Sequence, residues 1–244
     1  MSNRAAPVIV GNVYDKYGTR NPVARWLMRG FLDAVSELYL SVRPERVLEI
    51  GCGEGRLAQY LISLSHRPQV FHACDLSLDQ LAPNLDKRLE FSTTDIYNLP
   101  FESASFDLIV CCEVLEHLEF PDRGLAEIAR VSSRSVLIST PREPLWRLLN
   151  LLRGKYWRSL GNTPGHLQHF SQLGLIRRLS DHLEISQIRT PVPWTIIIGQ
   201  LRAGSLSSTA HPLSGSSMFL SPCSDQCGQD LKNGENRIVS TEGL

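Results

Sequence analysis

The sequence predicts an α/β protein with a seven-stranded, mostly parallel sheet and helices on both faces of that sheet. Apolar runs of strand length alternate with segments whose apolar residues recur at helical spacing, which is typical of parallel sheets. The last two runs, near residues 183–190 and 194–202, are joined by "TPVPW", which is too short for a crossover helix. We therefore expect these two strands to pair antiparallel.

The first part of the chain begins with a capped helix. Asn21 is a favourable N-cap residue, Pro22 fits the first helical position, and an apolar stripe at helical spacing follows. Strands and helices then alternate. The elements expected up to residue 95 are a helix over 22–40, a strand over 46–50, a helix over 55–65, a strand over 69–75, a helix over 77–88 kinked near Pro83, and a strand within 89–95.

The second part contains the most apolar strand. "FDLIVCCEV" at 106–114 is apolar almost throughout, as expected of a strand that is buried on both faces. A helix carrying Leu125 and Ile128 then opens at Pro121. The remaining expected elements are a strand over 134–140, a helix over 171–181, and the two final strands.

The composition limits which classes of protein the chain can belong to. The chain has 244 residues, a formal net charge of zero and 42% hydrophobic residues, which fit one soluble domain and give no overall signature of nucleic-acid binding. No apolar run reaches the length of a membrane span, and the N-terminus does not resemble a signal peptide. We expect reduced thiols and a cytoplasmic location. The six cysteines are Cys52, Cys74, Cys111, Cys112, Cys223 and Cys227.

Three segments are expected along the chain. Residues 1–44 form an N-terminal helical cap, and residues 45–202 form the main domain, with a lid inserted at 141–170. Residues 203–244 are rich in Ser and Gly and lack periodicity, so we expect a disordered tail.

A glycine loop follows the first strand. In "LEIGCGEG", residues 48–55, glycines stand at 51, 53 and 55. Ligands of open α/β sheets bind beyond the carboxyl ends of the strands, and glycine permits positive φ and close approach. The helix that begins near Gly55 would also favour an anionic group. The alternative is a tight strand–helix turn that simply favours glycine.

The spacing of this loop separates two cofactor classes. A dinucleotide needs G-x-G-x-x-G, whereas this loop reads G-x-G-x-G and is preceded by Glu49. S-adenosyl-L-methionine (SAM) has an amino-acid end, whose ammonium suits Glu49 and whose carboxylate suits the helix N-terminus. The loop therefore favours SAM.

Two further acidic residues end the next two strands. Asp75 has the position to accept both hydroxyls of a ribose, with a helix cap as the alternative. Asp95 has the position to accept from the adenine amino group while the Ile96 backbone meets the ring, with the start of a turn as the alternative. Three acids around one crevice are less readily explained by chance than any one alone.

These segments resemble a known family. The stretches "VLEIGCGEGRLAQYL", "ACDLS", "TTDIYNLPFESASFDLIVCCEVLEHLEF" and "VLISTP" are similar to class I SAM-dependent methyltransferases of the methyltransferase type 11 group, well over 45–140 and loosely over 141–202. The resemblance implies a Rossmann-like seven-stranded class I methyltransferase fold, SAM as cofactor, and methyl transfer. The cofactor-binding residues that it implies are Glu49, Gly51, Cys52, Gly53, Gly55, Asp75, Leu76, Asp95, Ile96, Cys112 and Glu113.

The catalytic step requires few chemical groups from the protein. In-line displacement at a sulfonium methyl requires positioning, and a base helps only where the acceptor loses a proton. In "CCEVLEH", a helical turn would place Glu113, Glu116 and His117 on one face. His117 and His166 are the candidate catalytic residues, and simple packing of His117 is the alternative.

A metal is not expected, but one alternative stays open. The E-x-x-E-H pattern at 113–117 resembles metal-dependent small-RNA 2′-O-methyltransferases and some quinone-pathway O-methyltransferases, in which a later histidine completes the ligand set. His166 or His169 would be that histidine here. Mixed carboxylate and imidazole ligands suit divalent metals.

The lid is the main clue to the acceptor. Residues 141–170 hold Glu143 as their only acid, together with an apolar stripe and the basic residues Arg142, Arg147, Arg153, Lys155 and Arg158. We favour a lid helix with solvated arginines; an anionic acceptor, or a lipid-like one drawn from a membrane surface, is the functional alternative. The opposite wall is expected to offer Tyr14, Tyr17 and Arg20.

Three functional classes remain at this point. A small-molecule methyltransferase with no nucleic-acid partner is preferred, because the chain is neutral and shows a single domain. A methyltransferase acting on RNA or protein, and a non-catalytic partner subunit with this fold, are the alternatives. The acceptor, the atom methylated and the oligomeric state stay open.

Overall fold

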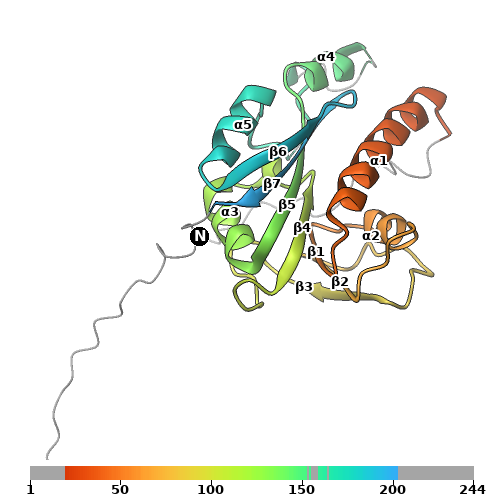
Figure 1. The fold of residues 1–244 in the computed structure, drawn as a ribbon. Helices are drawn as coiled ribbons and strands as arrows, with labels where there is room; N and C mark the ends of the chain where they lie inside the picture. Colours follow the sequence, from red (N-terminus) through yellow and green to blue (C-terminus); the bar gives the residue numbers. More distant parts are fainter. Residues whose placement is uncertain (1–19, 153, 155–158, 164, 203–244) are drawn as a thin grey trace, which may run out of the picture. The chain divides into compact units, whose positions relative to one another are not determined.

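The computed structural model describes residues 20–152, 154, 159–163 and 165–202 (Figure 1). All of them fall within one compact unit. The predictions made for Tyr14, Tyr17, Cys223, Cys227 and the tail at 203–244 concern residues outside this range. None of the helices in the described part is long and apolar enough to cross a membrane.

The sheet has seven strands in the order β3-β2-β1-β4-β5-β7-β6. Strands β1 to β5 pair in parallel, and β1 lies between β2 and β4. The predicted α/β class and the mostly parallel sheet are confirmed. The strands are β1 (Arg46–Ile50), β2 (Val70–Asp75), β3 (Leu89–Thr93), β4 (Phe106–Cys112), β5 (Ser132–Pro141), β6 (Leu183–Arg189) and β7 (Trp194–Leu201).

The final strand runs against the rest of the sheet. β7 is inserted between β5 and β6 and is antiparallel to both, with Leu137 opposite Ile198. Only four residues separate Arg189 from Trp194, so the chain turns back on itself between β6 and β7. The predicted antiparallel pairing is therefore confirmed.

Helices cover both faces of the sheet (Figure 1). The Asn21 side chain accepts from the Val23 and Ala24 N–H groups and caps the first helix, as the sequence predicts. α1 and α2 pack on one face through Phe31 and Leu61, whereas α3 and α5 pack on the other. The helices are α1 (Pro22–Val42), α2 (Arg56–Ile62), α3 (Pro121–Val131), α4 (Leu145–Leu152) and α5 (Gln172–Ser180).

The central strands separate two hydrophobic cores. Successive residues of a strand point to opposite faces, so Val110 joins the core under α1 and α2 while Cys111 joins the core under α3 and α5. Both residues are fully buried. This explains why the sequence of β4 is apolar throughout rather than alternating.

The helix expected over 77–88 does not form. Turns connect β2 to β3, Pro83 has no N–H to donate, and Asn84 adopts a left-handed φ of 60°. Leu78, Leu81 and Leu85 nevertheless pack against the first core from this loop. Their helical spacing therefore reflects burial from a loop and not a helix. α2 is also shorter than expected, because it ends at Ile62.

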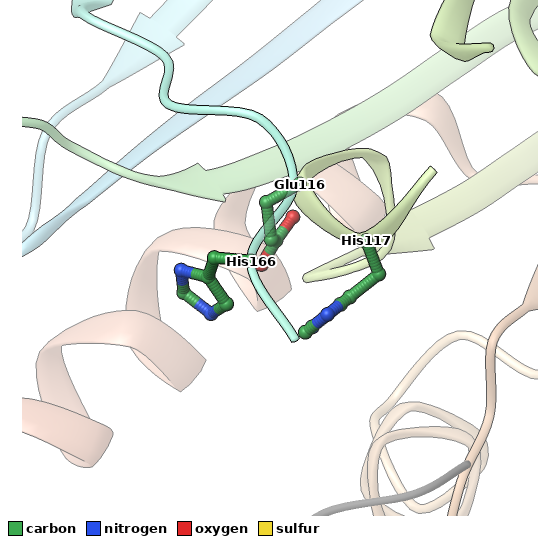
Figure 2. A group of neighbouring side chains, drawn as sticks. All are labelled: Glu116, His117 and His166. Carbon is green, nitrogen blue, oxygen red and sulfur yellow. The ribbon is translucent and has the colours of Figure 1, made fainter. Parts of the chain in front are cut away.

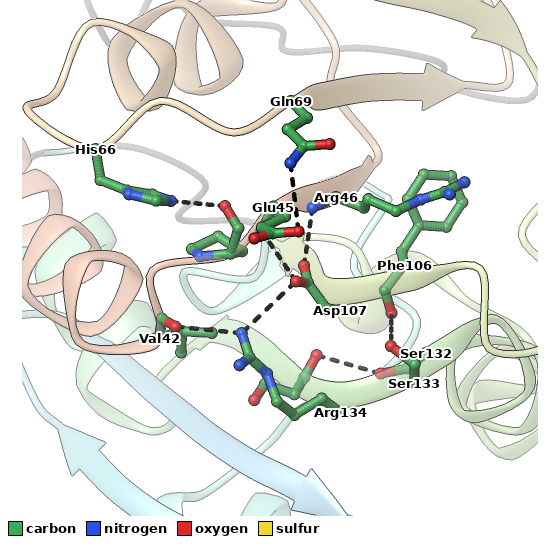
Figure 3. A network of polar contacts seen from close by, with 12 residues as sticks. Val42, Glu45, Arg46, His66, Gln69, Phe106, Asp107, Ser132, Ser133 and Arg134 are labelled. Carbon is green, nitrogen blue, oxygen red and sulfur yellow. Dashed lines mark hydrogen bonds and ion pairs between the residues drawn. The ribbon is translucent and has the colours of Figure 1, made fainter.

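A polar network fastens the amino ends of β1 and β4 (Figure 3). The Asp107 carboxylate accepts from the Glu45 N–H at 2.9 Å and from the Arg46 N–H at 3.0 Å. Arg134 lies 3.7 Å from the same carboxylate and donates to the Val42 carbonyl at the end of α1. These contacts fix where the first strand starts, at the edge of the sheet opposite to the glycine loop.

Candidate active site

The glycine loop is a tight turn between β1 and α2. The Gly51 and Cys52 N–H groups both donate to the Cys74 carbonyl, at 2.8 and 3.1 Å, and fold the loop over the end of β2. Gly51 has φ 77°, and a Cβ at this position would overlap the Val114 side chain. Glycine is therefore required at position 51 by conformation and by packing.

Glu49 carries a buried carboxyl beneath this loop. The residue is 3% exposed, and the Ala58 N–H in the first turn of α2 donates to its side chain. Its Oε2 atom is buried without a hydrogen-bond partner among the described residues. Burial, with the nearby Asp75 charge, raises the pKa of Glu49 to about 8. A cation placed here would stabilise the ionised form. The helix N-terminus expected to take an anion is thus partly occupied by Glu49.

Asp75 holds the loop in place. It ends β2, and its Oδ2 atom accepts from the Gly53 N–H at 2.8 Å. The helix-cap alternative does not apply, because no helix follows Asp75. Leu76, the next residue, is 51% exposed. A carboxylate accepts several hydrogen bonds, so this contact leaves Asp75 capacity for a ligand.

Asp95 lies after β3, one strand further along the same edge. Its side chain is exposed and accepts from the Tyr97 N–H at 2.9 Å, which is the turn geometry expected of the alternative interpretation. Ile96 is buried, at 6% exposure, and packs into the second core. Because β1, β2 and β3 are parallel neighbours, Glu49, Asp75 and Asp95 all follow the same edge of the sheet.

The cysteines of the site act as apolar residues. Cys52 and Cys112 are buried, and burial raises the pKa of both thiols well above the ordinary value. Burial also raises the pKa of Cys74 to about 12. The four cysteines of the described part are all reduced. These thiols therefore stay protonated at neutral pH and are poor nucleophiles.

Glu113 does not share a face with Glu116 and His117, contrary to expectation. The helical turn is η1 (Leu115–His117), and Glu113 precedes it with a left-handed φ of 60°. Its carboxylate accepts from Trp194 Nε1 at 2.8 Å and from Ser139 Oγ at 3.3 Å. Glu113 thus links the end of β4 to β5 and β7.

The structure instead brings Glu116, His117 and His166 together (Figure 2). Each offers one ligand atom, and these atoms all lie within 4.8 Å of one another. Glu116 is 1% exposed. The rings of His117 and His166 stand edge to face, 5.0 Å apart between centroids. A buried carboxyl and two imidazoles thereby face one another beyond the end of β4.

Backbone hydrogen bonds explain how His166 reaches this group. The Leu167 and Gln168 N–H groups donate to the Glu116 carbonyl at 2.8 and 2.9 Å. His117 donates from Nδ1 to the Gly165 carbonyl at 2.9 Å. The segment around 165–168 is thus bound directly to η1. His169, the other expected candidate, is exposed and contacts Asn162 Oδ1 through Nε2 at 2.8 Å, so it lies outside the group.

Sequence reasoning missed the partners of these acidic residues. Trp194 lies 81 positions from Glu113, and only the return of β7 beside β5 brings it to the site. The register pairs Trp194 with Pro141, at the end of β5. The sequence did contain a signal for this contact, namely a Trp at the start of the last strand. Because an antiparallel strand begins at the edge where the parallel strands end, its first residue lies near their carboxyl ends.

The comparisons with known proteins agree with this geometry. A family model described as "Methyltransferase domain" matches residues 48–138, which run from β1 through the glycine loop to β5. This match places a methyltransferase domain over strands β1 to β5 of the chain. The solved structures described below share the fold of a larger part of the sheet.

Curated relatives match only part of this chain. The chain is 37% identical over 98 residues to phthiotriol/phenolphthiotriol dimycocerosates methyltransferase 1 of Mycobacterium ulcerans, covering 38% of this chain and 35% of that protein. It is 36% identical over 90 residues to the mitochondrial ubiquinone biosynthesis O-methyltransferase of Candida albicans, covering 33% and 27%. The match therefore spans about a third of these relatives or less.

Solved structures share the fold over most of the chain. Magnesium protoporphyrin IX methyltransferase (ChlM) from Synechocystis PCC 6803, with bound SAH, superposes with a TM-score of 0.56 at 19% identity and covers 76% of this chain and 90% of that one. The PH0226 protein from Pyrococcus horikoshii OT3 superposes with a TM-score of 0.59 at 16% identity, covering 78% and 97%. The Rossmann-like class I fold predicted from the sequence is confirmed.

Proposed function

We propose that the methyltransferase domain binds SAM and transfers its methyl group to a small-molecule acceptor. The observation that carries this proposal is the buried Glu49 carboxyl, whose Oε2 atom has no partner among the described residues. A buried carboxyl is stabilised by a neighbouring cation, and the ammonium of the methionine end is such a group. The likeness to a structure with bound SAM supports the same cofactor.

The surrounding residues would hold the rest of the ligand. Asp75, fixed by the Gly53 N–H, would accept from the ribose hydroxyls, and Asp95 from the adenine amino group beside the Ile96 backbone. Cys52, Leu76 and Cys112 would supply apolar contacts. Glu113 would keep the end of β4 in place through Trp194, close to the sulfonium side.

Positioning would account for most of the catalysis. SAM supplies a methyl group already activated on a sulfonium, and the protein holds the acceptor in line with it. His117 and His166 would face the acceptor and take its proton where the acceptor carries one. The Nδ1–H of His117 donates to Gly165, which leaves Nε2 as the basic nitrogen.

Calorimetry with SAM and with its demethylated product tests the cofactor. We expect wild-type protein to bind both, and Gly53→Val to bind neither, because the branched side chain would enter the methionine site. Gly174→Ala, in the exposed first turn of α5, is the control and should bind normally. Wild-type protein that binds NAD but not SAM would refute the proposal.

A second role for the Glu116 group is favoured by its donor set. One buried carboxylate and two imidazoles, with ligand atoms within 4.8 Å of one another, fit a divalent ion such as Zn²⁺ or Mn²⁺. The hydrogen bond from His117 to Gly165 resembles the outer contacts that orient metal-binding histidines. A bound metal ion would polarise an acceptor oxygen. This proposal departs from the sequence-based expectation that no metal binds.

Metal analysis of purified protein separates metal binding from base catalysis. If the ion binds, His117→Ala and His166→Ala should both lower the metal content, while His169→Ala, outside the group, should not. If the histidines act only as bases, turnover should fall in both variants while metal stays at background and a chelator has no effect.

The acceptor class is proposed from the lid. Its basic and apolar residues favour an anionic or lipid-like small molecule over RNA or protein, since the chain as a whole is neutral. Relatives named for a dimycocerosate lipid and for ubiquinone support a hydrophobic acceptor. The reduced thiols support the proposed cytoplasmic location.

A further inference from the structure

The lid helix α4 buries a polar side chain while it exposes two leucines. Asn150 is the one residue of α4 that is buried, at 4% exposure, and its amide donates to the Gly161 carbonyl at 2.9 Å. Leu148 and Leu152, one turn apart, are 53% and 74% exposed. A helix packed on a globular core turns its leucines inward and its polar residues outward. Part of the apolar surface of α4, at Leu148 and Leu152, is therefore directed away from the protein, while Trp146 packs against the first core.

Neighbouring residues extend this face. Leu160 is 69% exposed and is held against α4, because Arg147 Nε donates to its carbonyl at 3.2 Å. A shallow hollow of about 560 Å³ opens beside Leu145 and Leu148 and is bordered by Arg142. We call the leucines at 145, 148, 152 and 160 the apolar lid surface. Its leucines gather on one short segment, which marks an interaction site and not scattered exposure.

The start of α1 repeats the pattern at the same end of the molecule. Val23 and Trp26 are 63% and 66% exposed. α1 reaches the lid through a chain of rings, since Phe31 lies 5.0 Å from Trp194, which lies 6.1 Å from Trp146. Figure 1 shows α4 and the beginning of α1 at the upper end of the fold.

Positive charge exceeds negative charge in the two segments that carry these apolar residues. Their described parts, 20–33 and 142–152, contain five arginines and two acids, Asp33 and Glu143, in a chain whose net charge is zero. The basic residues Arg153, Lys155 and Arg158 lie outside the described residues. Arg25 and Arg29 are exposed beside Trp26. A second copy of the chain is a poor partner for this region, because pairing like surfaces would bring cations together. An anionic surface with an apolar interior is complementary.

We propose that the apolar lid surface and the start of α1 dock on a bilayer that contains anionic lipids. The leucines and Trp26 enter the interfacial layer while the arginines meet lipid phosphates. This proposal rests on the proposed function in one respect: docking would place the acceptor site next to a substrate held in the membrane. Docking itself requires neither SAM nor an acceptor.

Vesicle co-sedimentation of the full chain tests docking. We expect the protein to sediment with vesicles of phosphatidylcholine and phosphatidylglycerol at low salt, and to remain in solution with phosphatidylcholine alone. Salt at about 0.5 M should release it, because exposed charges are then screened beyond a few ångströms. Absence of binding to anionic vesicles would overturn the proposal whatever the outcome of SAM calorimetry.

Matched variants locate the surface. Leu148→Ser with Leu152→Ser should lower the fraction bound by about tenfold, while Leu173→Ser should not, although this leucine is 56% exposed on α5. Arg25→Gln with Arg29→Gln should weaken binding to anionic vesicles, unlike Arg177→Gln on α5. Equal losses in the control variants would overturn the assignment. The oligomeric state without lipid is a further check. If the wild-type chain forms a dimer that Leu148→Ser with Leu152→Ser dissociates, the surface binds a second copy and the membrane proposal is overturned.

Discussion

Glu49 shows how a single residue can carry the chemistry of a site. The carboxyl lies under the glycine loop, receives the Ala58 N–H, and has a pKa of about 8 because burial disfavours its charge. The sequence predicts its position, since it lies in a buried strand one residue before that strand ends at Ile50 and the loop begins. Its environment follows from the fold, because Ala58 and Asp75 approach it from the next helix and the next strand.

Protonation of Glu49 makes stability depend on pH. The pKa rises from 4.5 to about 8 on folding, so between these values the native state binds more protons than the unfolded state. Stability from this residue is therefore fully present below about pH 4.5 and is lost as the pH rises to about 8. Urea unfolding at several pH values measures this effect. As the pH rises from about 4.5 to about 8, the unfolding free energy of Glu49→Gln should increase relative to that of wild type by an amount of order 1 kcal/mol or more.

The exposed Glu119→Gln serves as a control for that measurement, and its stability should stay parallel to that of wild type. If the unfolding free energies of Glu49→Gln and wild type also change in parallel with pH, Glu49 ionises as readily in the folded protein as in the unfolded chain, and the prediction is wrong.

Secondary-structure elements were predictable where their signal is local. The cap of α1 at Asn21 and the buried run of β4 depend on neighbouring residues, and both appear where expected. The expected helix over 77–88 failed because three leucines at helical spacing are buried from a loop. The helical turn expected to include Glu113 begins only at Leu115. The carboxylate of Glu113 is bound instead by Trp194, from a distant strand.

The starts of β1 and β4 depend on Asp107. Asp107→Ala leaves the Glu45 and Arg46 N–H groups without their acceptor, so we expect a loss of about 1–2 kcal/mol in unfolding free energy. Thermal unfolding measures this loss. SAM affinity should change little, because the glycine loop lies at the other end of β1. Asp33→Ala, whose side chain is 69% exposed, is the control and should unfold like wild type. A loss of SAM binding at full stability would contradict this separation.

On the scale of the whole molecule, the sequence predicts the sheet but not which distant residues meet. The alternation of elements and the short β6–β7 connection were sufficient for the fold class. The group formed by Glu116, His117 and His166 depends on the segment at 165–168 binding to η1, which no local pattern encodes. That segment lies some fifty residues further along the chain.

All seven strands lie between residues 46 and 201, which makes the proposed domain boundary testable. A chain that ends at Arg202 keeps every strand pairing of the sheet, so its melting temperature should remain within about 2 °C of the full chain. Its SAM affinity should be unchanged. A large drop in either measurement would show that residues 203–244 contribute to the folded domain.

The buried carboxyl of Glu49 also has a consequence for the proton balance of ligand binding. Near neutral pH this group holds a proton in the empty site, because its pKa is about 8. An ammonium bound beside it favours the ionised form, so each binding event at pH 7 should release most of one proton to the solution. The heat of SAM binding should then vary with the ionisation enthalpy of the buffer, and this variation should vanish in Glu49→Gln.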